Sequence, residues 1–228
     1  MKSLKILYNP KKVFNEISEN ATWGRDYIIL SFLIVLIAVF MLPITEQILN
    51  NLGPLKRLSS NQMAMIKTAA NKVQYLGIMA EPIVFIIKNL IFSVLLYFGI
   101  QIYKGKKVFS ELFALSIVAS SIIVLAGIIN TIALYYRGIE NVKRIFDIYV
   151  ISLNTLFNPN DIGIPLYQFL TNINIFEAWF IIILIYGVSK IAEIDKKKSS
   201  LIVITSWLVL VMFNVIQAII SYNATHLN

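Results

Sequence analysis

The residues best placed to do chemistry lie inside long apolar stretches of the sequence. The run "VFIIKNLIFSVLLYFGIQIYKGKK", from Val84 to Lys107, is apolar enough to cross a bilayer, yet Lys88 lies four residues inside it. Glu81 precedes Lys88 by seven positions, nearly two helical turns, so both side chains share one helix face. Three interpretations stay open: an ion pair with Glu81, snorkelling of the Lys88 ammonium to the headgroups, and membership of a larger polar cluster.

Further polar residues recur at a similar depth in the other apolar stretches. If the N-terminus is cytoplasmic, each apolar stretch contributes a polar group to the half of its span that is nearest the outer face of the membrane. Unpaired polar groups are costly in hydrocarbon, so such groups seek one another. The sequence therefore predicts a hydrogen-bonded cluster in the outer half of a helical bundle, with either a functional or a purely structural role. This predicted polar cluster comprises Glu81, Lys88, Asn89, Asn130, Glu177, Asn214 and Gln217.

Most catalytic and metal-binding patterns are missing from the sequence. The chain has no cysteine, its one histidine is His226, and it has no HExxH or GxSxG motif. No pair of aspartates faces across the apolar stretches, as an intramembrane aspartyl protease requires. We therefore predict no catalytic residues, no metal site and no cofactor. Ser120, Ser121, Gly127 and Gly187 are interpreted as small residues that allow close helix packing.

Composition places these residues in a membrane protein. Of the 228 residues, 58% are hydrophobic and 14% are charged, against about 25% charged in an average soluble domain. The mean hydropathy is +0.75, and several apolar runs reach the roughly 20 residues that cross a bilayer. The net charge of +8 is attributed to residues that flank membrane spans, so nucleic acid is not an expected partner.

Five apolar runs predict an all-α, polytopic bundle of five transmembrane helices. Each run must be helical, because a lipid-exposed strand edge would leave backbone groups unpaired. The runs are continuous rather than alternating, which excludes a β-barrel. The predicted spans are residues 27–42, 82–103, 109–135, 175–192 and 201–222.

The segments around the spans predict amphipathic helices at the membrane interface. Asn9 and Pro10 suit the start of a helix that places Val13, Phe14 and Ile17 on one face. Helical spacing also recurs in the long connections 48–81 and 136–174. The predicted organisation is an interfacial N-terminal segment, a membrane domain and a short C-terminal tail, at 1–26, 27–222 and 223–228.

The distribution of Lys and Arg predicts the orientation. Twelve of the twenty lie in the N-terminal segment and in the short turns 104–107 and 190–198. Because positive residues concentrate on the cytoplasmic side, we expect a cytoplasmic N-terminus and an extracytoplasmic C-terminus. The seven on the other side are spread over long connections: Lys56, Arg57, Lys67, Lys72, Arg137, Lys143 and Arg144.

Three segments carry a resemblance to a known family: "NPKKVFNEISENATWGRDYIIL", "GKKVFSELFALSIVASSIIVLAG" and "NIFEAWFIIILIYGVSKIAEIDKKKSSLIVITSWLVL". In order, they resemble the entry segment, the third span and the last two spans of the Yip-type (Ypt/Rab-interacting protein) integral membrane domain. The resemblance implies five spans, a cytoplasmic N-terminus and no established catalytic residues. Many relatives carry a proline in the third span where this chain has Ser120 or Ser121, which leaves a kink there open.

The resemblance and the composition together give two expected functions. The first is a non-enzymatic membrane-organising or scaffold protein in a prokaryotic plasma membrane, acting through the lipid bilayer and through a membrane-protein partner or a homo-oligomer. The second is a small transporter or channel that uses the predicted polar cluster. Eukaryotic relatives are linked to Rab-type GTPases and vesicle trafficking, but this chain lacks their long cytoplasmic N-terminal region. The sequence therefore argues against a Rab-type GTPase as a partner.

Overall fold

The computed structural model describes residues 1–51, 59–103, 105–106, 108–139 and 148–226, and within these ranges every regular element is a helix. The basic residues Lys56, Arg57, Lys104, Lys107, Lys143 and Arg144 lie outside the described residues. The elements are α1 (Lys2–Lys5), α2 (Pro10–Glu19), α3 (Gly24–Phe40), α4 (Leu42–Asn51), α5 (Ser60–Ile102), α6 (Phe109–Ala119), α7 (Ser121–Arg137), η4 (Leu153–Leu156), α8 (Pro159–Ile162), α9 (Ile164–Thr171), α10 (Ile175–Ile191) and α11 (Lys196–His226).

Within the described residues, four stretches of helix are long and apolar enough to cross a membrane: Gly24–Ile48, Met65–Ile102, Phe109–Arg137 and Lys196–Ile220. A fifth follows if α9 and α10, which meet at a bend of 62°, count as one span. The predicted all-α, polytopic membrane fold is confirmed, with four to five spans. The protein is an integral membrane protein.

The N-terminal segment packs on the bundle as a cap. The Asn9 side chain accepts a hydrogen bond from the Lys12 backbone N–H, and Pro10 opens α2, as the sequence predicts. The shared face of Val13, Phe14 and Ile17 is buried in the core that α6 and α10 also line. This face therefore contacts protein, which differs from the lipid interface predicted for it.

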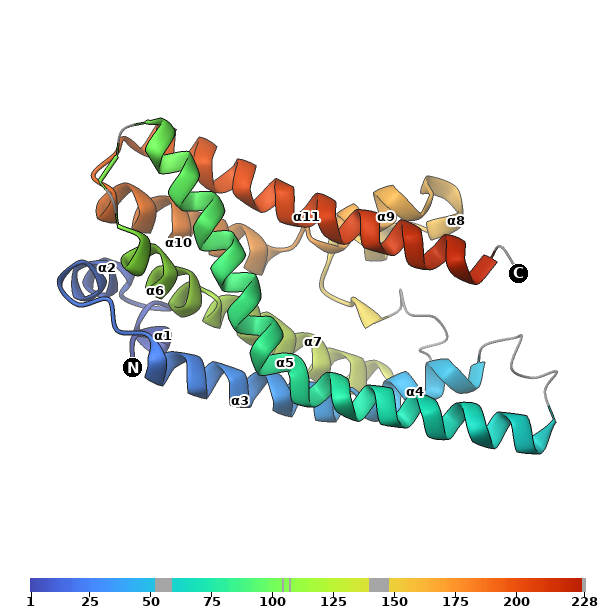
Figure 1. Ribbon diagram of the computed structural model, residues 1–228. Helices are drawn as coiled ribbons and strands as arrows, with labels where there is room; N and C mark the ends of the chain where they lie inside the picture. The colour runs from blue at the N-terminus through green and yellow to red at the C-terminus, as the bar shows by residue number, and fades with distance from the viewer. Residues whose placement is uncertain (52–58, 104, 107, 140–147, 227–228) are drawn as a thin grey trace.

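Helix α5 is continuous over 43 residues, where the sequence predicts an interfacial helix followed by a span at 82–103. Pro82 lies near its midpoint, and α5 changes direction partway along its length (Figure 1), as a proline inside a helix favours. Tyr27 Oη donates to the Pro82 carbonyl at 3.1 Å, so Pro82 lies beside the first turn of α3. The sequence predicts that Pro82 starts a helix. In the structure Pro82 lies inside a helix, and the missing N–H and the kink of a proline are tolerated inside membrane helices.

The predicted third span is two helices in line, α6 and α7, separated at Ser120. Ser120 Oγ is 2.9 Å from the Ser116 carbonyl, and Ser121 Oγ is 2.8 Å from the Val118 carbonyl. Hydroxyls that bond back to the preceding turn loosen and bend a helix. The predicted third span is therefore interrupted at Ser120, although no proline is present there. This is the position at which the family resemblance leaves open whether the helix is kinked.

The basic turns lie at one end of the molecule, together with the N-terminal cap (Figure 1). The Lys106 backbone N–H donates to the Ala192 carbonyl at 3.2 Å, which joins the α5–α6 turn to the α10–α11 turn. Helix α2 packs on α10 at the same end. We name this region the basic end. The start of α5 and the last turns of α11 lie at the opposite end.

The long connection before α10 contains short helices. Residues 140–147 lie outside the described part of the chain, and η4, α8 and α9 follow. Helix α9 packs along α11 and against η4. Helix α11 continues to His226, through most of the segment predicted as a tail.

Candidate functional site

The seven residues of the predicted polar cluster occupy separate places in the fold. Within the part of the chain that the structure describes, none of the seven forms a hydrogen bond or an ion pair with another. Three make hydrogen bonds that tie elements together, one lines a groove, and three are exposed.

Asn89 is the centre of a buried polar node between α5 and α6–α7. Its amide Oδ1 accepts hydrogen bonds from Ser116 Oγ at 2.7 Å and from Ser120 Oγ at 2.9 Å. Its Nδ2 donates to the Phe85 carbonyl at 2.9 Å, and Ser93 Oγ donates to the Asn89 carbonyl at 2.7 Å. Asn89 is 5% exposed and Ser93 and Ser116 are fully buried, so the node is closed to lipid and water.

The node coincides with the interruption at Ser120. Ser116 and Ser120 are four residues apart, so they share a helix face and reach the same amide oxygen. The sequence analysis assigned Ser120 to close packing and did not connect Ser116 with Asn89. The four-residue spacing of the two serines, together with an asparagine in another span, is the sequence signal for this node. Other polar residues in different spans fit the same pattern, and the packing of the helices decides which of them meet.

Glu177 and Trp207 connect α10 with α11. Trp207 Nε1 donates to Glu177 Oε2 at 3.1 Å. The Asn174 side chain accepts from the backbone N–H groups of Phe176 and Glu177, both at 3.0 Å, and so caps α10 where it bends away from α9. The carboxylate at the helix start also complements the helix dipole.

Asn130 holds the connection after α7 against that helix. Its Nδ2 donates to the Ile148 carbonyl at 2.9 Å, and its Oδ1 accepts from the Val150 N–H at 2.9 Å. A two-sided amide contact of this kind fixes an irregular backbone segment, because it pairs both a donor and an acceptor. Asn130 therefore acts within the protein at the end opposite the basic end.

Glu81 lines a shallow groove of about 430 Å³ between α3–α4 and the first half of α5. The lining is mostly apolar, with Ile37 and Met41 among it, and Thr45 and Gln74 add polar atoms that hydrogen-bond to each other. Glu81 is half-buried. Glu81 is therefore the member of the predicted polar cluster that faces this groove.

Lys88, Asn214 and Gln217 are exposed on the outer surface. Lys88 and Glu81 form no ion pair, and Lys88 is the one charged side chain among the exposed residues of the described stretch 73–102. Its exposed neighbours Ile87 and Ile91 are apolar. The exposure of Lys88 and its lack of an ion pair with Glu81 are compatible with snorkelling of the ammonium to the headgroups, which stays a prediction.

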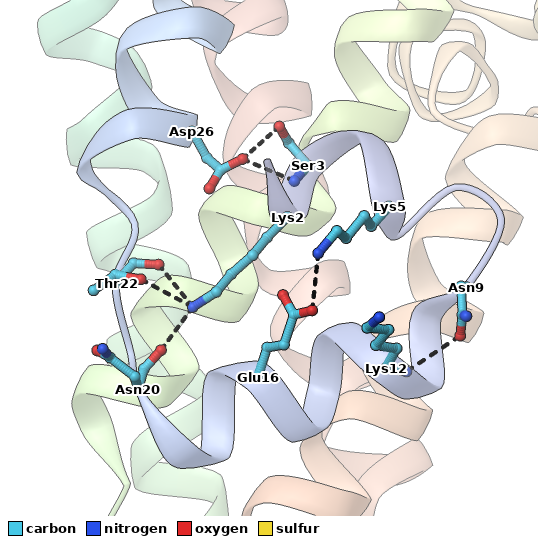
Figure 2. Close-up of polar contacts among 9 residues, drawn as sticks. All are labelled: Lys2, Ser3, Lys5, Asn9, Lys12, Glu16, Asn20, Thr22 and Asp26. Carbon is cyan, nitrogen blue, oxygen red and sulfur yellow. Dashed lines mark hydrogen bonds and ion pairs between the residues drawn. The ribbon is translucent and has the colours of Figure 1, made fainter.

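A polar network at the basic end was missed by the sequence analysis (Figure 2). Asp26, 5% exposed in the first turn of α3, accepts from the Ser3 N–H at 2.8 Å and from Ser3 Oγ at 2.6 Å. Lys2 Nζ donates to the carbonyls of Asn20 and Thr22 at 2.6 and 3.2 Å. These contacts fasten α1 to the start of α3.

The network also perturbs two pKa values. Burial lowers the pKa of the Lys2 ammonium, against the opposing attraction of Asp26 and Glu16. Lys5 Nζ donates to Glu16 Oε1 at 3.0 Å, and this hydrogen bond lowers the pKa of the Glu16 carboxyl. The contacts join residues that lie between 11 and 23 positions apart in sequence, and no local pattern marks them.

The family model of the Yip1 domain matches residues 4–217 of the chain, from α1 into α11. The chain belongs to the Yip1 domain family. Neither the curated proteins nor the solved structures compared with this Yip1-domain chain include a match.

The polar groups of this Yip1-domain chain pair helices and connections within the protein. Among the residues that the structure describes, no three His, Asp or Glu side chains come together in a way that could hold a metal ion. The contacts of Asn89, Asn130 and Glu177 join helix to helix or helix to connection. These hydrogen bonds stabilise one packing arrangement of the helices and their connections.

Proposed function

We propose that this Yip1-family protein is a non-enzymatic membrane-organising or scaffold protein that acts through helix and lipid contacts. The observation that carries the proposal is that polar side chains of different helices hydrogen-bond to one another at two places in the bundle. Asn89 bonds to Ser116 and Ser120, and Glu177 bonds to Trp207. Interhelical hydrogen bonds of this kind are worth about 0.6 kcal/mol each in membranes, enough together to fix one helix arrangement.

The outer faces of the helices supply the contacts with lipid. Phe32 on α3, Met79 on α5 and Phe213 on α11 are between 58% and 77% exposed. At 1.5 Å per residue α5 is ~64 Å long, about twice the ~30 Å hydrocarbon core. Such a helix must tilt, bend or leave the bilayer, and each accommodation deforms the surrounding lipid.

The partners that fit this function are the lipid bilayer and either a second copy of the chain or another membrane protein. We place the protein in a prokaryotic plasma membrane with the N-terminus in the cytoplasm and the C-terminus outside. The basic end supports this orientation, because it gathers the N-terminal cap and both short basic turns on one side.

Reconstitution into vesicles of neutral phosphatidylcholine tests the proposal. We expect vesicle diameter and shape, seen by electron cryomicroscopy, to change in proportion to the protein-to-lipid ratio while entrapped solutes are retained. The Asn89→Ala variant loosens the helix packing and should reduce the effect. Vesicles indistinguishable from protein-free controls at every ratio would contradict a membrane-organising role.

A small transporter or channel is the second candidate, and the groove with Glu81 favours it. A carboxylate beside an apolar groove could attract a cation or a cationic amphiphile. Proteoliposomes should then show flux of a cation, and Glu81→Gln should abolish it while Lys88→Met leaves it unchanged. Flux in the wild type that depends on Glu81 would replace the scaffold proposal.

A further inference from the structure

Among the residues that the structure describes, six exposed lysines at the basic end form no ion pair: Lys11, Lys12, Lys190, Lys196, Lys197 and Lys198. Across the described residues, the ion pairs of this end are Lys5–Glu16 and Lys106–Glu193, and none of the six takes part. We propose that this lysine set binds the phosphates of anionic phospholipids in the leaflet that surrounds the basic end. The inference deepens the proposed membrane-organising function by naming the lipid class.

The lysines at the start of α11 lie against the rims of neighbouring spans. Lys196 Nζ lies 4.7 Å from the ring centre of Tyr186 on α10, and Lys198 Nζ lies 5.7 Å from that of Tyr103 at the end of α5. Tyr186 is 49% exposed on the outside of the bundle. Tyrosine rings at span ends occupy the headgroup level of a bilayer, so these ammonium groups lie at the depth of lipid phosphates.

Apart from the contacts of Lys196 with Tyr186 and of Lys198 with Tyr103, the lysines of α11 take part in neither ion pair of the basic end. Three successive lysines open a helix, where the helix dipole disfavours cations. Asp195 is the nearest acidic residue in sequence, and its Oδ2 accepts from the Lys197 backbone N–H rather than from an ammonium. An external anion is therefore the partner that satisfies them.

The position of the set favours lipid over other anionic partners. The lysines come from the start of α2, the end of α10 and the start of α11, and Lys196 and Lys198 lie beside the rings of Tyr186 and Tyr103. Tyrosine at the ends of spans is typical of the headgroup level, where anionic lipid supplies phosphates. At the opposite end, the described cations Lys67 and Lys72 are exposed on α5, and they provide a control of equal charge.

Lipid binding by the full chain purified in neutral detergent tests the inference. Native mass spectrometry and thermal unfolding would compare phosphatidylglycerol with phosphatidylcholine for the wild type, Lys196→Gln/Lys198→Gln and Lys67→Gln/Lys72→Gln. We expect a preference for phosphatidylglycerol that weakens in 500 mM salt, a condition in which charges at the surface are screened over ~4 Å. The apparent affinity should fall about fivefold for each lysine removed at the basic end.

The controls separate lipid binding from folding and from orientation. Lys67→Gln/Lys72→Gln and the charge-conserving Lys196→Arg/Lys198→Arg should both keep the wild-type preference. Equal responses of the wild type and Lys196→Gln/Lys198→Gln would overturn the inference and leave the lysines as an orientation signal. Tight binding of a duplex oligonucleotide without any lipid preference would overturn it in favour of nucleic acid. Because the function is tested in neutral vesicles, either proposal can fail alone.

Discussion

At the scale of single residues, neighbouring positions on α5 have opposite roles. Asn89 is buried and accepts hydrogen bonds from two serines, whereas Lys88 points outward. We predict that Asn89→Ala lowers the free energy of unfolding by about 1–2 kcal/mol, because three hydrogen bonds are lost. Lys88→Met should leave it unchanged. Reversible unfolding in mixed detergent micelles measures both, and equal losses would contradict the node.

Gly187 provides a second test at this scale. A Cβ at this position would lie 2.7 Å from Leu115 Cδ2 and 3.1 Å from Phe14 Cε1, so α10, α6 and α2 meet where glycine leaves space. We predict that Gly187→Ala costs about 1–3 kcal/mol through overpacking. Gly77→Ala is the matched control, because nothing lies within 4 Å of its Cβ position. A neutral Gly187→Ala would show that the three helices are not packed this closely.

At the scale of elements, the N-terminal cap depends on pH through Glu16. Its pKa lies below the ordinary value of 4.5 because Lys5 donates to it. The stabilisation is therefore present above the ordinary pKa and disappears as pH falls through the lowered one. Glu16→Gln should increase proteolysis around residues 20–23 at pH 7, and the difference from wild type should disappear as pH falls through the lowered pKa of Glu16. A pH-independent difference would contradict the ion pair, and Glu19→Gln is the control.

The bend of α5 is the second element-scale feature that can be measured. Pro82 removes one backbone hydrogen bond near the midpoint of the helix and allows its halves to take different directions. The chain has no cysteine, so spin labels at Lys72→Cys and Phe98→Cys report on the bend. We predict a longer distance between the labels in Pro82→Ala, since the straightened segment would approach its full length of ~39 Å. An unchanged distance would mean that packing, and not proline, sets the bend.

At the scale of the whole molecule, the sequence predicts the helices from local patterns, but it does not predict the contacts between residues that are far apart in the chain. The cap at Asn9, the apolar face of α2 and the basic turns follow from spacing and charge within a few residues. The partners of that face, the Ser3–Asp26 contact and the Asn89 node depend on how the helices pair. Many pairings satisfy the same sequence, so polar residues predicted as one cluster are found in separate places.

The depth of each polar residue was the least predictable quantity. The sequence predicts that Pro82 starts a span near the outer face of the membrane. In the structure, Pro82 lies beside Tyr27, in the first turn of α3. Residue depth in a bundle of tilted and bent helices depends on crossing geometry, which hydropathy does not record.

The central claim is that the helices form one membrane-embedded bundle whose N-terminal cap and short basic turns share a single side of the membrane. Single-cysteine labelling with a membrane-impermeant reagent tests it most directly in intact cells and inverted vesicles. We predict that Lys12→Cys and Lys197→Cys react only from the cytoplasmic side and Gln62→Cys only from the other, while Lys88→Cys stays unlabelled from both. Reaction of Lys12→Cys and Lys197→Cys from opposite sides would contradict the account.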